Sequence, residues 1–387
     1  MSKIGRIEVH EYVYEVENLG LDHGFNRVYT PGAKTKISNF AVVIRCADGA
    51  VGEYAALFGG RKSHVGQLLM VAPALIGQDA DFREAIYDRC KRLLRQVAFL
   101  GASAVDICLW DLLGKKVGAP VSILLGKVRD RLPAYASTLH GDRNGGLSSK
   151  EAYADFAEHC YALGFRGFKI HGWAEGDPHE EAENVLHVAR AVGDRMRLML
   201  DPACELRTFA DALYVGHACD EGGYFWYEDP FRDGAVSQHA HRKLRQMIKT
   251  PLLITEHVRG VEPKADWIVA EATDFVRADP EYDLGITGCM KIAHLAESFG
   301  LDVEIHAVGP AQRHCVAAIR NTNWYELNLV APGVRNPVPP VFGGDYSDQL
   351  EAVGKDGCYP VPSGPGLGVP IDWDFINRNR TALHVFE

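Results

Sequence analysis

From about residue 130 onward the sequence repeats one pattern, in which a short apolar run ends in a polar or charged residue and a helical stretch follows. Eight of these runs are strand candidates, spaced at intervals of roughly 20–35 residues. They are residues 132–137, 167–171, 197–201, 224–228, 252–256, 275–279, 303–307 and 324–328. Helical patterns separate most of them, for example at residues 149–163 and 179–192. This alternation favours a (β/α)₈ barrel, because the alternative, a doubly wound open sheet, lacks a Gly-x-Gly-x-x-Gly after its first strand.

The part of the chain before this repeat indicates an α+β unit. Residues 7–16 and 40–46 are strand candidates, and a loop-like segment rich in glycine and polar residues, 18–32, lies between them. Helical periodicity covers residues 82–97 and 102–117. We therefore predict an α+β unit followed by a barrel.

Three acidic residues end successive strands of the predicted barrel. Asp201 ends the third strand, Glu228 the fourth and Glu256 the fifth. Because catalytic groups of a barrel come from the carboxyl ends of its strands, we expect these side chains to meet at one mouth. Three carboxylates directed at one point repel each other unless a cation binds them, and oxygen ligands suit Mg²⁺ better than zinc. The sequence therefore predicts a magnesium site formed by these residues.

Further ionisable residues end the other strands of the barrel. Lys169 and His171 end the second strand, Asp279 ends the sixth, and His306 and Glu326 lie in the seventh and eighth. A charge at one strand end commonly marks only the exit of the chain from the core, but here the coincidence recurs on seven consecutive strands. An aspartate bonded to a histidine raises its basicity, and a glutamic acid kept protonated by burial can donate a hydrogen bond to an oxyanion. A metal flanked by such groups suits proton abstraction next to a carboxylate.

Charge and cysteine content exclude several other classes of protein. The net charge of −10 disfavours nucleic acid and anionic membrane as partners. The nine cysteines are dispersed and form no Cys-x-x-Cys pair, which is typical of reduced thiols. No apolar run follows the N-terminal charges as in a secretory signal, and no stretch has the length of a membrane helix. We therefore expect a cytoplasmic protein.

These residues resemble the enolase superfamily and, within it, the mandelate racemase subgroup. The resemblance covers nearly the whole chain and is specific because several motifs occur together. They are residues 103–114 (SAVDICLWDLLG), 118–120 (GAP), 124–126 (LLG), 228–230 (EDP), 286–288 (ITG) and 364–368 (GPGLG). The resemblance implies an α/β fold, a modified TIM (β/α)-barrel at residues 128–350 with an N-terminal α+β capping domain at residues 1–127. Residues 351–387 are then a C-terminal segment that returns to the capping domain.

The resemblance also implies a required Mg²⁺, a small carboxylate substrate and a homo-oligomer, either a dimer or an octamer. Position by position, it assigns a role to each of the residues at the strand ends. The metal ligands are Asp201, Glu228 and Glu256, and the matching catalytic residues are Lys169, Asp279, His306 and Glu326. His171 is a further catalytic candidate at a position where the family carries another residue.

Two positions depart from the pattern of the subgroup. His171 replaces the second lysine of a Lys-x-Lys motif that begins at Lys169, and Ala203 stands where many members carry asparagine. One robust acid/base histidine with a weaker second base suits dehydration better than racemisation by two bases. The resemblance thus implies an acid-sugar dehydratase, in which a base removes the proton α to the carboxylate and His306 helps to expel the β-hydroxyl, giving a 2-keto-3-deoxy acid.

Other reactions and other classes of protein remain as alternatives. The same enolate would serve a racemase, an epimerase or a cycloisomerase, and the sequence leaves open whether Lys169, His171 or His306 takes the proton. A non-catalytic sugar-acid-binding protein is disfavoured by the intact acidic triad. A metal-dependent hydrolase would require more histidine ligands than the strand ends provide.

Substrate specificity is expected from loops around the barrel mouth. The candidates are His23, Tyr29, Arg61 and His64 in the cap, and His140 and His257 after the first and fifth barrel strands. Arg61 and His64 would favour a diacid, because they could meet a distal carboxylate or hydroxyl groups.

Overall fold

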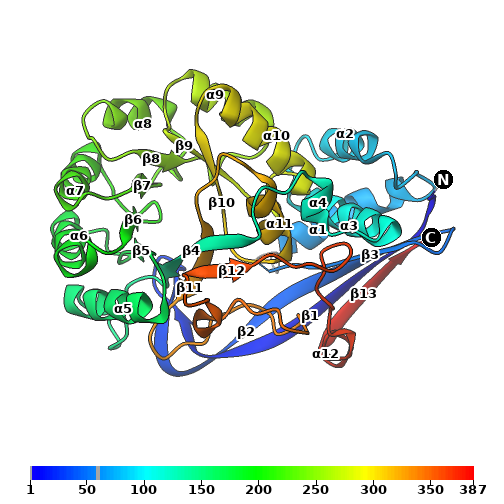
Figure 1. The fold of residues 1–387 in the computed structure, drawn as a ribbon, viewed down its shortest axis with the longest axis horizontal. Coiled ribbons are helices and arrows are strands. Elements are labelled where there is room, and N and C mark those ends of the chain that lie inside the picture. The colour runs from blue at the N-terminus through cyan, green and yellow to red at the C-terminus, as the bar shows by residue number, and fades with distance from the viewer. Residues whose placement is uncertain (1, 58–61) are drawn as a thin grey trace.

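A computed structural model describes residues 2–57 and 62–387, and most of these residues belong to a closed barrel. Within this part of the chain, eight parallel strands pair in sequence order, and the last, β11, closes on the first, β4 (Figure 1). They are β4 (Arg131–Thr138), β5 (Gly167–His171), β6 (Arg197–Asp201), β7 (Trp226–Glu228), β8 (Leu252–Ile254), β9 (Phe275–Ala278), β10 (Asp302–Ile305) and β11 (Tyr325–Val330). A further strand, β12 (Cys358–Pro360), joins β4 antiparallel. The predicted barrel is confirmed.

Except for Glu326, which is the second residue of β11, each predicted ionisable residue lies at or near the carboxyl end of its strand. The predicted strands 167–171 and 197–201 coincide with β5 and β6, whose register places His171 beside Asp201. Strands β9 and β10 end one residue before Asp279 and His306. Strand β8 ends at Ile254, two residues before Glu256. The strands therefore bring these side chains to one mouth of the barrel.

A helix follows each of the first seven barrel strands. These helices are α5 (Lys150–Leu163), α6 (Pro178–Val192), α7 (Phe209–Gly222), α8 (Gln238–Arg245), α9 (Val261–Val269), α10 (Gly285–Ser298) and α11 (Pro310–Ala318). Polar side chains accept hydrogen bonds from the first free N–H groups of several of them: Ser149 at α5, Asp177 at α6 and Thr208 at α7. After β11 the described chain forms only the short 3₁₀ helix η1 (Leu350–Ala352) before β12, so the barrel lacks an eighth helix of the usual kind.

The interior of the barrel is filled by an apolar layer below a charged one. Tyr135, Met199, Trp226 and Leu253 pack together inside the barrel. The Tyr135 hydroxyl lies 3.2 Å from Nη2 of Arg277, which belongs to the charged layer. Side chains alternate between the two faces of a strand, so one strand supplies both layers through every second residue.

An antiparallel sheet forms beside the barrel from both ends of the described chain. Its order is β13-β1-β2-β3, from β1 (Ile4–Leu21), β2 (Arg27–Cys46), β3 (Val51–Ala55) and β13 (Arg380–Phe386). Strand β13 pairs with β1, which places the two ends of the chain close together at this sheet (Figure 1). The N-terminal α+β unit expected from the sequence is confirmed, whereas the domain limits 1–127, 128–350 and 351–387 remain a prediction.

The prediction of a loop at residues 18–32 is wrong. Strand β1 continues to Leu21 and β2 begins at Arg27, so only a short turn separates them. The pairing continues past a bulge between Glu17 and Leu19. Most residues of this ribbon are partly exposed on both faces, so its sequence does not need the alternation of apolar residues by which strands are recognised.

Four helices connect the sheet to the barrel. They are α1 (Lys62–Leu75), α2 (Arg83–Leu93), α3 (Leu100–Val117) and α4 (Val121–Leu124), and α12 (Trp373–Arg378) precedes β13. Helix α3 packs on both β3 and the barrel helix α10. At this contact Trp110 Nε1 donates to Thr287 Oγ1 at 2.9 Å, and the Thr287 hydroxyl donates to Asp106. In the described part of the chain, no helix is both long enough and apolar enough to cross a membrane.

Candidate active site

A cavity of about 540 Å³ opens at the carboxyl ends of the barrel strands, and the β1–β2 hairpin forms part of its wall. Barrel residues of the wall include Lys169, His171, Asp201, Glu256, His306 and Glu326. Residues from the hairpin include Asn26, Arg27, Thr35, Lys36 and Ser38. The cavity therefore lies between the two parts of the fold.

Asp201, Glu228 and Glu256 come together as predicted, and we call them the carboxylate triad. One carboxylate oxygen from each lies within 4.8 Å of the others. Asp201 and Glu228 are buried, and Glu256 is partly exposed toward the cavity. A compact set of three carboxylate oxygens fits a hard divalent cation such as Mg²⁺, which takes oxygen ligands and keeps further positions for water or substrate.

Two buried cations neutralise these acids. Lys169 Nζ lies 3.2 Å from Asp201 Oδ2, 2.8 Å from Glu228 Oε2 and 3.0 Å from Glu326 Oε1. Arg277 Nε lies 2.9 Å from Glu228 Oε1, and its Nη2 lies 3.0 Å from Glu326 Oε2. Burial opposes the charge of Lys169, but Glu228 and Glu326 raise its pKa well above the ordinary value. Lys169 is therefore a protonated ammonium that binds carboxylates.

The sequence analysis considered Glu326 as a hydrogen-bond donor on the condition that burial keeps it protonated. Burial alone would raise its pKa, but the charges of Arg277 and Lys169 and a hydrogen bond from the Ala307 N–H lower it well below the ordinary value. Glu326 is therefore a carboxylate, because its partners are cations and N–H donors that stabilise the ionised form.

Asp279 and His306 form the predicted dyad. His306 Nδ1 lies 2.6 Å from Asp279 Oδ2, and its Nε2 lies 3.6 Å from Glu256 Oε1. Burial lowers the pKa of His306, but the charge of Glu256 and the hydrogen bond to Asp279 outweigh it and raise the pKa to about 9. The ring stacks on that of Tyr282 at 5.7 Å. These contacts favour the protonated form of His306, which lines the cavity.

Both ring nitrogens of His171 face hydrogen-bond acceptors. Its Nδ1 lies 2.7 Å from the Thr138 carbonyl oxygen, which can only accept, so Nδ1 bears a proton. Its Nε2 lies 3.1 Å from Asp201 Oδ2, and the His140 ring centre lies 4.7 Å from that of His171. Burial and the neighbouring His171 lower the pKa of His140 to about 3, so His140 is neutral.

The predicted substrate-binding residues divide into two groups. His140 and His257 line the cavity. His23 instead is exposed at the turn between β1 and β2, and Tyr29 packs against Gly333. Neither of these two residues is part of the cavity wall.

His64, a further cap candidate, is not part of the cavity wall either. His64 lies on α1 with its ring 5.9 Å from that of Tyr282, so Tyr282, which lines the cavity, separates it from the space. Arg61 lies outside the described residues.

Several residues of the site and its wall were missed by the sequence analysis. Arg277 lies two residues before Asp279, so the period of two along β9 places both on the interior face, and this signal could have identified it. Asn328 lines the cavity two residues after Glu326 by the same rule. Lys36 had no such signal, because it belongs to the hairpin.

Left-handed backbone conformations occur beside the site. Ala203, Asp229, Thr255 and Ala307 have φ angles of 50°, 35°, 87° and 70°. Residues other than glycine rarely adopt these angles, and each costs on the order of 1–3 kcal/mol. Such strained positions cluster at active sites, and here each lies within two residues of a triad or dyad member.

Known proteins share both parts of the fold. The family described as "Enolase C-terminal domain-like" matches residues 152–375, and "Mandelate racemase / muconate lactonizing enzyme, N-terminal domain" matches residues 30–126. The crystal structure of D-glucarate dehydratase from Agrobacterium tumefaciens complexed with magnesium superposes with a TM-score of 0.88 at 29% identity, over 98% of this chain and 100% of that one.

Two further relatives carry different activities. Arabinonate dehydratase from Saccharolobus solfataricus is 26% identical over 86% of this chain and 87% of its own length. D-galactarolactone cycloisomerase from Agrobacterium fabrum is 29% identical over 88% and 90%. With the family match covering more than half of its residues, this chain belongs to the mandelate racemase/muconate lactonizing enzyme family of the enolase superfamily.

Proposed function

We propose that this chain is a Mg²⁺-dependent acid-sugar dehydratase, which converts an aldonate or aldarate to a 2-keto-3-deoxy acid. The observation that carries the proposal is the Asp279–His306 pair, in which the imidazole lines the cavity and is held by Asp279. Elimination of a hydroxyl needs an acid that delivers a proton to the leaving oxygen. Two relatives, one by sequence and one by structure, are dehydratases of this class, which supports the same assignment.

The carboxylate triad would hold the cation. When bound, Mg²⁺ stabilises the negative charge that develops on the substrate carboxylate during proton abstraction. Lys169, at the same wall, holds a positive charge available to that carboxylate.

Two histidines divide the proton transfers. His171 receives the α-proton at Nε2, because its Nδ1 donates to the Thr138 carbonyl oxygen; for this step the substrate replaces the contact of Nε2 with Asp201 Oδ2. His306 then donates its Nε2 proton to the β-hydroxyl, which leaves as water, while Asp279 holds the imidazole through Nδ1. The resulting enol tautomerises to the 2-keto-3-deoxy acid. Lys169 is disfavoured as the base, because three carboxylates stabilise its ammonium form.

A panel assay tests the reaction. Aldonates and aldarates incubated with the protein and Mg²⁺ are expected to yield 2-keto acids. The alternative hypothesis is a racemase, an epimerase or a cycloisomerase, and the cycloisomerase relative supports it. Exchange of the α-proton in D₂O without any keto acid from any member of the panel would favour that reading.

Substitution of each histidine tests the division of roles. We expect His306→Asn to slow dehydration by about 10²–10⁴-fold, the usual contribution of a general acid, while α-proton exchange in D₂O continues. His171→Asn is expected to abolish both. The matched control is His217→Asn on α7, whose side chain is 58% exposed and should leave both rates unchanged. Loss of exchange in His306→Asn would show that His306 is the base.

The cytoplasmic location and the homo-oligomer, dimer or octamer, remain predictions. Size-exclusion chromatography with light scattering would determine the assembly.

A further inference from the structure

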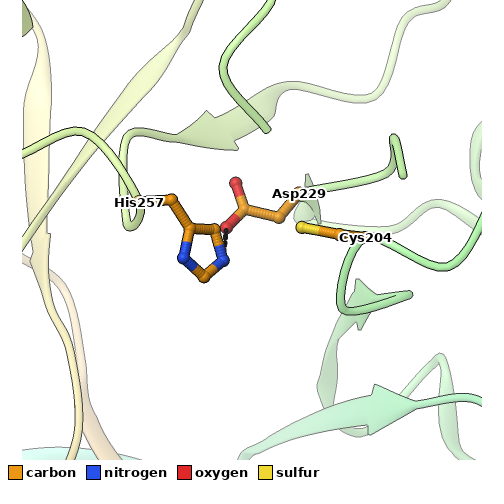
Figure 2. Close-up of side chains that lie close together, drawn as sticks. All are labelled: Cys204, Asp229 and His257. Carbon is orange, nitrogen blue, oxygen red and sulfur yellow. Dashed lines mark ion pairs between the residues drawn. The ribbon is translucent and has the colours of Figure 1, made fainter. Parts of the chain in front are cut away.

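Three potential metal ligands outside the proposed reaction lie directly beside the carboxylate triad. Cys204 follows Asp201 by three residues, and Asp229 and His257 each follow a triad member by one. One ligand atom from each of the three lies within 4.8 Å of the others. Figure 2 shows Asp229 between His257 and Cys204, with a dashed line for the ion pair of His257 and Asp229. We call these residues the Cys–Asp–His cluster.

The Asp229 carboxylate is incompletely satisfied. Its side chain is only 2% exposed, and its Oδ2 lies 3.4 Å from His257 Nε2. Its Oδ1 is buried and has no hydrogen-bond partner among the described residues. A buried charge without adequate partners costs free energy, and the negative charges of Glu228 and Glu256 add to that cost here. A cation would offset both.

The cluster is rigid at one side and accessible at the other. The Cys204 N–H donates to the Asp229 carbonyl at 2.8 Å, which ties the loops after β6 and β7 together. The His257 side chain is 40% exposed, so its ring can turn to complete the ligand geometry. Asp229 and His257 line the cavity, which gives an ion a route of entry.

The chemistry of these ligands differs from that of the triad. A thiolate, an imidazole and one carboxylate suit a borderline ion such as Zn²⁺, whereas Mg²⁺ takes oxygen ligands. Three protein ligands and an open fourth position are typical of zinc sites that contact solvent or substrate. We propose that Cys204, Asp229 and His257 form a second metal site, selective for Zn²⁺, at the wall of the substrate cavity.

Cobalt spectroscopy tests the site independently of any catalysis. Full-length, metal-free protein is titrated with Co²⁺ in excess Mg²⁺, which occupies the triad. A thiolate ligand is expected to produce a near-ultraviolet sulfur-to-cobalt charge-transfer band that saturates at one Co²⁺ per chain and disappears on addition of Zn²⁺. The absence of this band from the wild-type protein would overturn the proposal.

Matched variants identify the ligands. Cys204→Ser should abolish the band, and His257→Gln should weaken Zn²⁺ binding at least tenfold in equilibrium dialysis. The cysteine control is Cys358→Ser, since Cys358 is the other cysteine that is not fully buried and lies on β12, which pairs with the opposite end of β4. The histidine control is His217→Gln, and both controls should bind Zn²⁺ like the wild type.

A band that persists in Cys204→Ser or vanishes in Cys358→Ser would also overturn the proposal. Because the readouts are spectra and metal content, failure of the dehydratase assignment would leave them unaffected.

Discussion

His306 couples the protonation of the site to the stability of the protein. The folded protein raises the pKa of this group to about 9, whereas a histidine in an unfolded chain titrates near about 6.5. The stabilisation is therefore fully present below about pH 6.5 and is lost as the pH rises through about 9. We expect the free energy of unfolding in metal-free buffer to fall more steeply between these values in the wild type than in His306→Asn.

Urea unfolding at a series of pH values in a chelator measures this difference. The chelator matters because a cation on Glu256 would remove part of the negative charge that raises the pKa. His217→Asn, on the exterior of the barrel, should follow the wild type. Parallel pH profiles for the wild type and His306→Asn would contradict the prediction.

Single residues were predictable from the sequence where their role depends on position along a strand. Asp201, Glu228 and Asp279 were identified because each ends a predicted strand, and His306 because it lies in one. The ionisation of Glu326 was not, because it depends on Lys169 and Arg277 from other strands. A pattern along one strand predicts where a side chain lies, but it does not show which charges surround it.

At the scale of elements, Arg277 links three strands of the barrel. Its guanidinium on β9 contacts Glu228 on β7 and Glu326 on β11, all of them buried. Removal of one partner from a buried ion-pair network leaves uncompensated charge, which typically costs about 3–5 kcal/mol. We expect Arg277→Met to lower the free energy of unfolding by about this amount, measured by urea denaturation.

A surface ion pair provides the control for Arg277. Arg320 pairs with Glu297, but its side chain is 79% exposed, so Arg320→Gln should change stability by less than about 0.5 kcal/mol. If Arg277→Met does not fold, Arg277→Lys keeps the charge but cannot reproduce the forked geometry, and should show an intermediate loss. Equal stability of Arg277→Met and Arg320→Gln would refute the linking role.

Strands were predictable from the sequence where one face is buried in the barrel interior and the other face is covered by helices. Strands β5 and β6 were predicted with their observed limits, since both are buried apolar runs. The ends of β1 and β2 were missed, because their ribbon is partly exposed on both faces. The helical signals around the barrel were stronger, since capping residues mark the starts of α5, α6 and α7.

At the scale of the whole molecule, the cavity combines two parts of the fold with different contributions. The barrel supplies the reacting groups, and its architecture followed from the repetition of strand and helix. The hairpin supplies Asn26, Arg27 and Lys36 to the facing wall. It reaches the barrel through the His140 N–H, which donates to the Arg27 carbonyl at 3.2 Å. That contact joins residues more than a hundred positions apart, which no local pattern could predict.

This division suggests that the hairpin distinguishes substrates with one carboxylate from those with two. If the α-carboxylate binds at the triad, the far end of the sugar chain faces the hairpin, where Lys36 is an exposed cation on the cavity wall. A charge-assisted hydrogen bond of about 1.5–3 kcal/mol to a distal carboxylate corresponds to roughly a tenfold to hundredfold effect. We expect Lys36→Met to lower kcat/KM at least tenfold for an aldarate and much less for the aldonate of the same length.

Lys34→Met is the control, because Lys34 lies on the same strand but pairs with Glu15 and Glu17. This variant should turn over both substrates at the wild-type rate. An equal loss of kcat/KM for the two substrates in Lys36→Met would show that Lys36 does not bind the second carboxylate.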